Sequence, residues 1–77
     1  MKEVKVDSIY EHYKGKRYKI LAIARDSEDA DRELVVYQGL YDSKEFGNNP
    51  VWARELNDFM AEIEYNGKKI KRFKLVK

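Results

Sequence analysis

The stretch that decides the fold is Glu33-Leu-Val-Val-Tyr-Gln-Gly-Leu-Tyr41. It is rich in β-branched and aromatic residues, which suit the pleated, half-buried surface of a strand. Alternate residues divide it into two faces: Leu34, Val36, Gln38 and Leu40, and Val35, Tyr37, Gly39 and Tyr41. We therefore expect residues 33–41 to form the strongest strand of the chain.

Two residues of this strand are unusual at their positions. Gln38 shares its face with three aliphatic side chains, so either it satisfies backbone groups at the mouth of a barrel or this face opens towards a ligand. Gly39 marks either a β-bulge or a close approach of another group to the backbone. The sequence leaves both choices open.

A hairpin is expected before this strand. Residues 9–13 lead to Gly15, and an alternating run from Arg17 to Arg25 follows, which predicts a hairpin that turns near Gly15 into a long strand. Apolar residues on both faces of that run are typical of a barrel strand that is covered on one side and partly covered on the other. Residues 26–32 are too polar to pack and are expected to form a solvated loop or a frayed helical turn.

The second half of the chain predicts shorter elements. We expect a loop over 42–50, a strand over 51–54, one helical turn over 55–60 and a closing hairpin over 61–76. Asn66-Gly67 is a strong signal for a type I′ turn in that hairpin. The whole pattern predicts a mainly β fold, with five to six strands in a small, strongly bent barrel and one short helical turn.

Length and composition indicate one small domain. With 77 residues the chain is too short for a second core, so we expect one domain over 1–77, with 1–8 as a flexible N-terminal segment. There are no cysteines, and therefore no disulfides, to stabilise it. Ten aromatic residues must supply much of the core.

The N-terminal residues alternate charged and aliphatic side chains, unlike a signal peptide, and no stretch approaches the roughly 18–20 apolar residues of a membrane span. We therefore expect a cytoplasmic protein with no membrane partner. The net charge is only +2, but its distribution is uneven. Residues 68–77 hold six cations and no anion, whereas 26–33 hold five acids and one arginine.

The chain resembles a family of small bacterial proteins of unknown function, DUF1653. The resemblance covers nearly the whole chain from residue 10 and rests on 10–15, 18–25 with 27–28, 35–41, 51–54, Phe59 and 72–73. Asp26 stands where the family is expected to have histidine, and Glu55 stands where it usually has proline. The resemblance implies an SH3-like barrel and brings no established activity.

His12 is the single histidine, and its ordinary pKa near 6.5 would suit acid–base chemistry. An enzyme would need His12 beside a partner such as Glu28 or Tyr37. The hydroxyl nucleophiles available outside the tyrosines are Ser8, Ser27 and Ser43, of which the last two lie in polar loops. The alternative is a ring packed in a hairpin and bonded to the backbone. One histidine and scattered carboxylates have no metal-site spacing, so we expect no catalytic residues, no metal ion and no cofactor.

The most site-like set combines cationic, amide and aromatic side chains on or at the ends of strands. In a barrel these residues would converge at one mouth and offer guanidinium groups and a stacking face to an anion. The candidate ligand-binding residues are Arg25, Tyr37, Gln38, Trp52, Arg54 and His12. The alternative is an internal network in which Glu28 neutralises an arginine and Gln38 caps strand ends.

Two further surfaces stay open as alternatives. Basic residues in the two hairpins would follow a nucleic-acid backbone, or would simply protect exposed strands from aggregation. They are Lys14, Lys16, Arg17, Lys19, Lys68, Lys69, Lys71, Arg72 and Lys74. An aromatic groove for a peptide, or core packing without a ligand, would use Tyr10, Tyr13, Tyr37, Tyr41 and Trp52.

These observations predict a non-enzymatic binding module that recognises a protein segment or an anionic ligand at the barrel mouth. The first alternative is an RNA-binding or other nucleic-acid-binding protein that uses the basic hairpins. The second is an enzyme that uses His12. We expect a monomer or a weak dimer.

Overall fold

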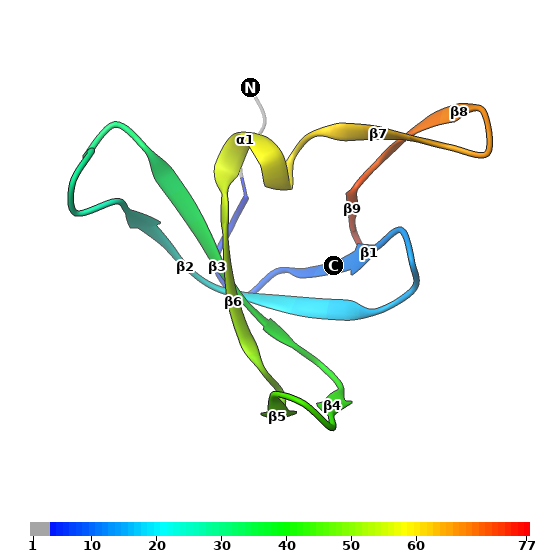
Figure 1. Cartoon of the computed structure of the whole chain (residues 1–77), viewed down its shortest axis with the longest axis horizontal. Coiled ribbons are helices and arrows are strands. Elements are labelled where there is room, and N and C mark those ends of the chain that lie inside the picture. Colours follow the sequence, from blue (N-terminus) through cyan, green and yellow to red (C-terminus); the bar gives the residue numbers. More distant parts are fainter. Residues whose placement is uncertain (1–3) are drawn as a thin grey trace.

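A five-stranded antiparallel sheet organises the molecule in the computed structural model, which describes residues 4–77. Its spatial order is β6-β3-β2-β1-β9 (Figure 1). The strands are β1 (Ile9–His12), β2 (Arg17–Arg25), β3 (Glu33–Gly39), β6 (Val51–Glu55) and β9 (Phe73–Leu75). The first and last strands of the chain, β1 and β9, are thus neighbours in the sheet.

The first hairpin forms as the sequence predicts. β1 and β2 pair antiparallel with Tyr10 opposite Tyr18, and Gly15 has a φ of 105° in the turn between them. β2 then pairs with β3 along its length, with a register shift between Ile20 and Ala22. This bulge lets both Ile20 and Ile23 face the same side of the sheet as Tyr37 and Val35.

The smaller elements extend from this sheet. β4 (Asp42–Ser43) and β5 (Gly47–Asn48) form a two-residue ladder inside the expected loop over 42–50. α1 (Leu56–Phe59) is the expected helical turn, and β7 (Glu62–Tyr65) pairs with β8 (Lys68–Lys71) in a separate hairpin. Figure 1 shows β7 and β8 as an arm that projects beyond β1.

The core is built largely from rings on one face of the sheet. Its fully or nearly fully buried hydrophobic residues are Val4, Ile20, Val35, Tyr37, Phe59 and Phe73. Phe59 from α1 stacks on Phe73 from β9, with ring centroids 4.1 Å apart and planes inclined by 7°. This contact joins the helical turn to the last strand, so the core depends on residues distant in sequence.

The mainly β fold is confirmed, and the closed barrel is not. β6 and β9 form the two edges of the five-stranded sheet and do not pair with each other among residues 4–77, so the sheet is open. The SH3-like detail therefore stays unconfirmed. The expected flexible segment over 1–8 lies partly outside the described residues, and within its described part Val4 packs into the core and the Asp7 N–H donates to the Ile20 carbonyl at 2.8 Å.

A glycine is needed at position 39 because the Tyr41 ring lies close to the backbone there. A close approach was one of the two explanations that the sequence left open. A Cβ atom there would lie 2.5 Å from a ring carbon of Tyr41. We expect Gly39→Ala to lower the free energy of unfolding by about 1–3 kcal/mol, because the Tyr41 ring must move. Thermal unfolding measures this loss. Gly39→Ala should cost less in a Tyr41→Ala background, and equal costs in both backgrounds would contradict the explanation.

Candidate functional site

A small pocket opens on the core face of the sheet. Its volume is about 210 Å³, and it is lined by His12, Tyr18, Tyr37, Tyr41, Trp52, Arg54 and Phe73. The strand pairing explains this set, because Tyr37 lies opposite Trp52 and Val35 lies opposite Arg54, so all four share one face. Rings form most of its walls, and Arg54 contributes a guanidinium group.

Contacts on both sides hold Arg54 in place. Its Nε donates a hydrogen bond to the Tyr37 hydroxyl at 3.3 Å, and its Nη1 contacts the Asp58 carboxylate at 2.8 Å. The hydrogen bond to Tyr37 raises the pKa of Arg54, so its positive charge is permanent. Its side chain keeps 31% of its surface exposed. Arg54 is thus a fixed cation that solvent and solutes can reach.

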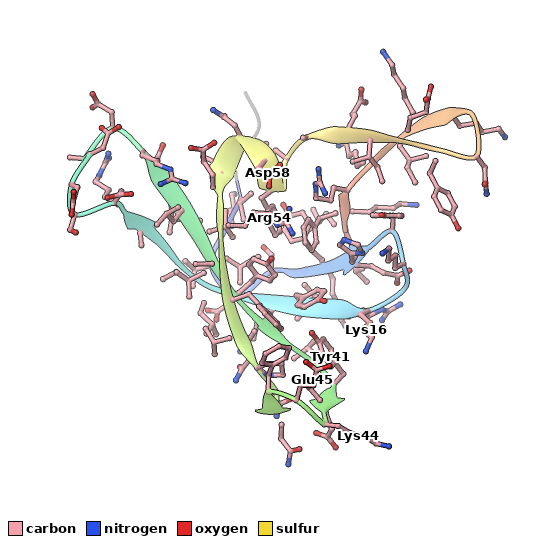
Figure 2. All side chains as sticks on the ribbon, viewed as in Figure 1. Lys16, Tyr41, Lys44, Glu45, Arg54 and Asp58 are labelled. Carbon is pink, nitrogen blue, oxygen red and sulfur yellow. The ribbon has the colours of Figure 1, made fainter. Side chains whose placement is uncertain are left out.

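Asp58 bridges two arginines. Asp58 Oδ1, the carboxylate oxygen that does not contact Arg54, lies 3.5 Å from Nη2 of Arg72. Arg72 is the residue between β8 and β9. The Arg72 Nε is buried and has no hydrogen-bond partner in the described part of the chain. In Figure 2, Arg54 and Asp58 lie together beside α1, near the centre of the molecule. One carboxylate therefore only partly compensates two guanidinium groups at this position.

Tyrosine side chains form a second wall of the pocket. The hydroxyls of Tyr18 and Tyr41 are hydrogen-bonded, 3.3 Å apart. Burial, and then this hydrogen bond, raise the pKa of Tyr18 well above its ordinary value, so it stays protonated. The Lys16 Nζ lies 4.2 Å from the centroid of the Tyr41 ring, and Figure 2 shows the two side chains near each other. This wall thus carries a cation at its outer edge.

Trp52 closes the remaining side. The edge of Phe46, from the loop between β4 and β5, packs against its ring with a centroid distance of 5.1 Å. The indole N–H of Trp52 is buried and has no hydrogen-bond partner among residues 4–77. Buried N–H groups normally have an acceptor. Trp52 therefore brings an unused donor to the pocket region.

His12 is held as a neutral ring. The backbone N–H of Lys14 donates to its Nδ1 at 3.2 Å, which leaves the ring proton on Nε2. Burial, and then the charges of Arg54, Lys14 and Arg72, lower the pKa of His12. Its ring packs edge-on against Phe73, with a centroid distance of 4.9 Å. These contacts match the prediction of a ring packed in a hairpin and bonded to the backbone.

The lowered pKa of His12 predicts a loss of stability in mild acid. As the pH falls below the ordinary value of 6.5, the unfolded chain takes up a proton that the folded chain still excludes. The free energy of unfolding should therefore decrease until the pH reaches the folded pKa. Urea unfolding between pH 8 and 5 measures this decrease, and His12→Gln should remove its share. A folded pKa at or above 6.5, measured by NMR, would contradict the prediction.

Only part of the predicted ligand set meets at this pocket. His12, Tyr37, Trp52 and Arg54 line it. Arg25 lies at the other end of β2, where its Nη1 donates to the Ala30 carbonyl at 2.7 Å.

Gln38, from the predicted ligand-binding set, and Glu28, from the alternative internal network, also lie away from the pocket. Gln38 alternates with Tyr37 and so occupies the opposite face of the sheet, where its Nε2 donates to the Asn49 carbonyl at 3.2 Å. Glu28 lies in the loop between β2 and β3, and Figure 1 shows this loop on the far side of the molecule from β1. The arginine in that loop, Arg32, pairs with Asp26 and Glu55 rather than with Glu28.

Acidic side chains partly compensate the positive charge of the two basic hairpins. Arg17 pairs with Glu11 at 3.1 Å, and Lys19 lies 3.7 Å from Asp7. In the arm, the register places glutamates directly opposite lysines: Glu62 faces Lys71 and Glu64 faces Lys69. These positions give the arm an alternation of charge rather than a continuous basic stripe.

Sequence reasoning did not identify Tyr18, Phe73 and Asp58 as neighbours of the site. Arg54 lies in β6 and Asp58 in α1, so their contact depends on how the helical turn follows the strand, and no local spacing rule predicts it. Within residues 4–77, no group of three or more His, Cys, Asp or Glu side chains could hold a metal ion. Nor does that part of the chain contain a helix long and apolar enough to cross a membrane.

Comparisons with known proteins agree on the family. The family described as "Protein of unknown function (DUF1653)" matches residues 8–75. A crystal structure of a DUF1653 protein from Bordetella bronchiseptica is similar in fold, with a TM-score of 0.77 and 30% sequence identity over 94% of this chain and 87% of that chain. Among curated proteins no match is found. The chain therefore belongs to DUF1653, a family of proteins of unknown function.

Proposed function

We propose that this protein is a non-enzymatic binding module, and that its pocket recognises an anionic group, carried by a protein segment or by a free ligand. The observation that carries the proposal is the position of Arg54. Its guanidinium lies in the wall of a 210 Å³ pocket whose other walls are mostly rings. A fixed guanidinium beside aromatic faces is a common way to bind carboxylates and phosphates.

The charges around the pocket support an anion. Lys14, Arg54 and Arg72 all act on His12 to lower its pKa, so they lie close enough to make a shared positive field. Lys16 adds a fourth cation over the Tyr41 ring. Asp58 is the carboxylate that contacts Arg54 and Arg72 within the described residues. An arriving anion would therefore meet a net positive site.

The surroundings of His12 favour binding over catalysis. Tyr37 lines the same pocket, but its hydroxyl accepts from Arg54, and His12 receives its hydrogen bond from the Lys14 backbone. No carboxylate or hydroxyl is hydrogen-bonded to His12 in the part of the chain described. A general base needs its partner within hydrogen-bond reach. A neutral His12 with its proton on Nε2 is instead a donor for a bound anion.

An NMR titration of the labelled full chain tests the proposal. The probes are sodium phosphate, sodium acetate and a short RNA oligomer, each at about 50 mM and about 200 mM salt. We expect phosphate and acetate to shift the amides of Tyr37 and Arg54 and the indole N–H of Trp52. Absence of these shifts with both anions would contradict the proposal. Shifts from RNA confined to 14–19 and 65–74, and lost at the higher salt, would favour nucleic-acid binding instead.

A further inference from the structure

A second and larger hollow lies next to the pocket, between the β7–β8 arm and β1. Its volume is about 500 Å³, its surface is mostly apolar, and it is lined by Glu11, His12, Tyr13, Ile70, Lys71 and Lys74. We call it the arm groove. Hollows of about 300–1,000 Å³ with apolar walls and a few polar groups are typical of binding sites.

The walls of the arm groove are held by contacts on both sides. The Tyr13 ring packs at 4.5 Å from His12 and edge-on at 5.4 Å from Tyr65 in the arm. The Tyr13 N–H donates to the Arg72 carbonyl at 3.0 Å, and the Arg72 N–H donates to the Ala61 carbonyl at 3.1 Å. The arm is therefore tied to β1, and the groove between them is a built feature of the fold.

Two cations line the rim of the arm groove. Lys71 and Lys74 are both exposed, and the register places Glu62 opposite Lys71 and Glu11 opposite Lys74. Glu11 lines it as well, but its carboxylate is already engaged by Arg17 at 3.1 Å. An occupant of the groove would thus place apolar groups against Tyr13 and Ile70 and negative charge near the two lysines.

His12 connects the arm groove to the first pocket, because it lines both. Arg54 lines the first pocket, and Lys71 and Lys74 line the arm groove, so both of the hollows that share His12 contain cations. A ligand with one anionic group would use one of these places. A ligand that uses both needs two negative charges separated by an apolar part.

We propose that the arm groove binds a segment of a partner protein in which apolar residues are flanked by acidic ones. The apolar side chains lie against Tyr13 and Ile70, one acidic side chain lies near Lys71 and Lys74, and the other reaches Arg54 past His12. The second of these acidic contacts rests on the proposed function of the pocket. The contact with the arm groove does not.

A defined peptide tests this inference on the full chain. The probe is acetyl-Gly-Glu-Leu-Phe-Asp-Gly-amide, with two matched peptides that carry Gln and Asn for the acids or Ser for both apolar residues. We expect the first peptide to shift the amides of Tyr13, Ile70 and Lys71, and both matched peptides to bind at least about fivefold more weakly. Absence of shifts in the arm groove at millimolar peptide would overturn the inference.

Charge reversals supply the matched variants. Lys71→Glu should weaken the binding of the first peptide by about three- to tenfold, because the acidic side chain of the peptide would then be repelled at the rim instead of attracted. Lys44→Glu makes the same change of net charge on the exposed loop between β4 and β5, far from the arm in Figure 2, and should leave the affinity unchanged. Equal losses in the two variants would overturn a specific role for the arm groove.

The two proposals fail in different ways. In one outcome the peptide shifts the amide signals of the arm groove, while phosphate and acetate leave the signals of Arg54 and Trp52 unchanged. The inference about the groove is then supported, and the proposal that the pocket binds an anion is wrong. In the other outcome phosphate shifts the amide signals of the pocket, while the peptide leaves those of Tyr13 and Ile70 unchanged. The proposal for the pocket is then supported, and the inference about the groove is overturned.

Discussion

Phe59→Ala should lower the free energy of unfolding by about 3–5 kcal/mol, the usual cost of removing a buried phenylalanine. Phe59 is 1% exposed. Its ring stacks on Phe73 at 4.1 Å and contacts Tyr10 and Tyr37 edge-on at 5.3 and 5.4 Å. A domain of this length has a total stability of only about 4–11 kcal/mol. The substitution should therefore leave a large part of the protein unfolded near body temperature.

Phe46→Ala is the matched control for this result. Phe46 is 61% exposed, and among the residues that the structure describes its aromatic contact is with Trp52 alone. We expect its loss to cost less than about 1 kcal/mol, as for most exposed positions. Urea unfolding followed by near-ultraviolet circular dichroism measures both variants. If the two variants were equally stable, the ring cluster around Phe59 would not be the centre of the core.

Local signals explain why most of the fold could be predicted. The Asn66-Gly67 turn needs two residues with positive φ, and the structure has φ values of 52° and 77° there. The hairpin through Gly15 and the helical turn before β7 follow equally local rules. Closure of the sheet is different, because it depends on whether β6 and β9 meet. No local pattern in either strand determines that contact.

The bulge between Ile20 and Ala22 shows a second limit. Nothing in the run from Arg17 to Arg25 marks it, since no glycine or proline lies there. Without a bulge, strict alternation would put Ile20 and Ile23 on opposite faces. The structure puts both on the core side, which no pattern of period two predicts.

The candidate site could be predicted where strand alternation was sufficient. Trp52 and Arg54 are two residues apart on one strand, so they share a face, and Tyr37 meets them through the register of β3 and β6. The same alternation separates Gln38 from Tyr37. The separation of Arg25 from Arg54 depends on the sheet order, which places β3 between β2 and β6, and the pairing of Asp58 with Arg72 depends on how α1 packs, so both needed the tertiary structure.

Arg54→Gln should weaken the binding of phosphate and acetate by about tenfold or more, because a hydrogen bond to a charged group contributes about 1.5–3 kcal/mol. Arg25→Gln removes the same charge from a residue outside the pocket lining, whose guanidinium donates to the Ala30 carbonyl. It should leave both affinities nearly unchanged. Amide shifts of the pocket residues measure the dissociation constants, and thermal unfolding checks that both variants remain folded.

Asp58→Asn should act in the opposite direction. It removes the carboxylate that contacts both Arg54 and Arg72 and leaves their charges uncompensated. We expect phosphate to bind about three- to tenfold more tightly, and to raise the melting temperature of this variant more than that of the original protein. An internal network predicts something else: both Arg54→Gln and Asp58→Asn would lose stability, and phosphate would restore neither. The opposite signs of the two substitutions therefore separate a binding site from a structural ion pair.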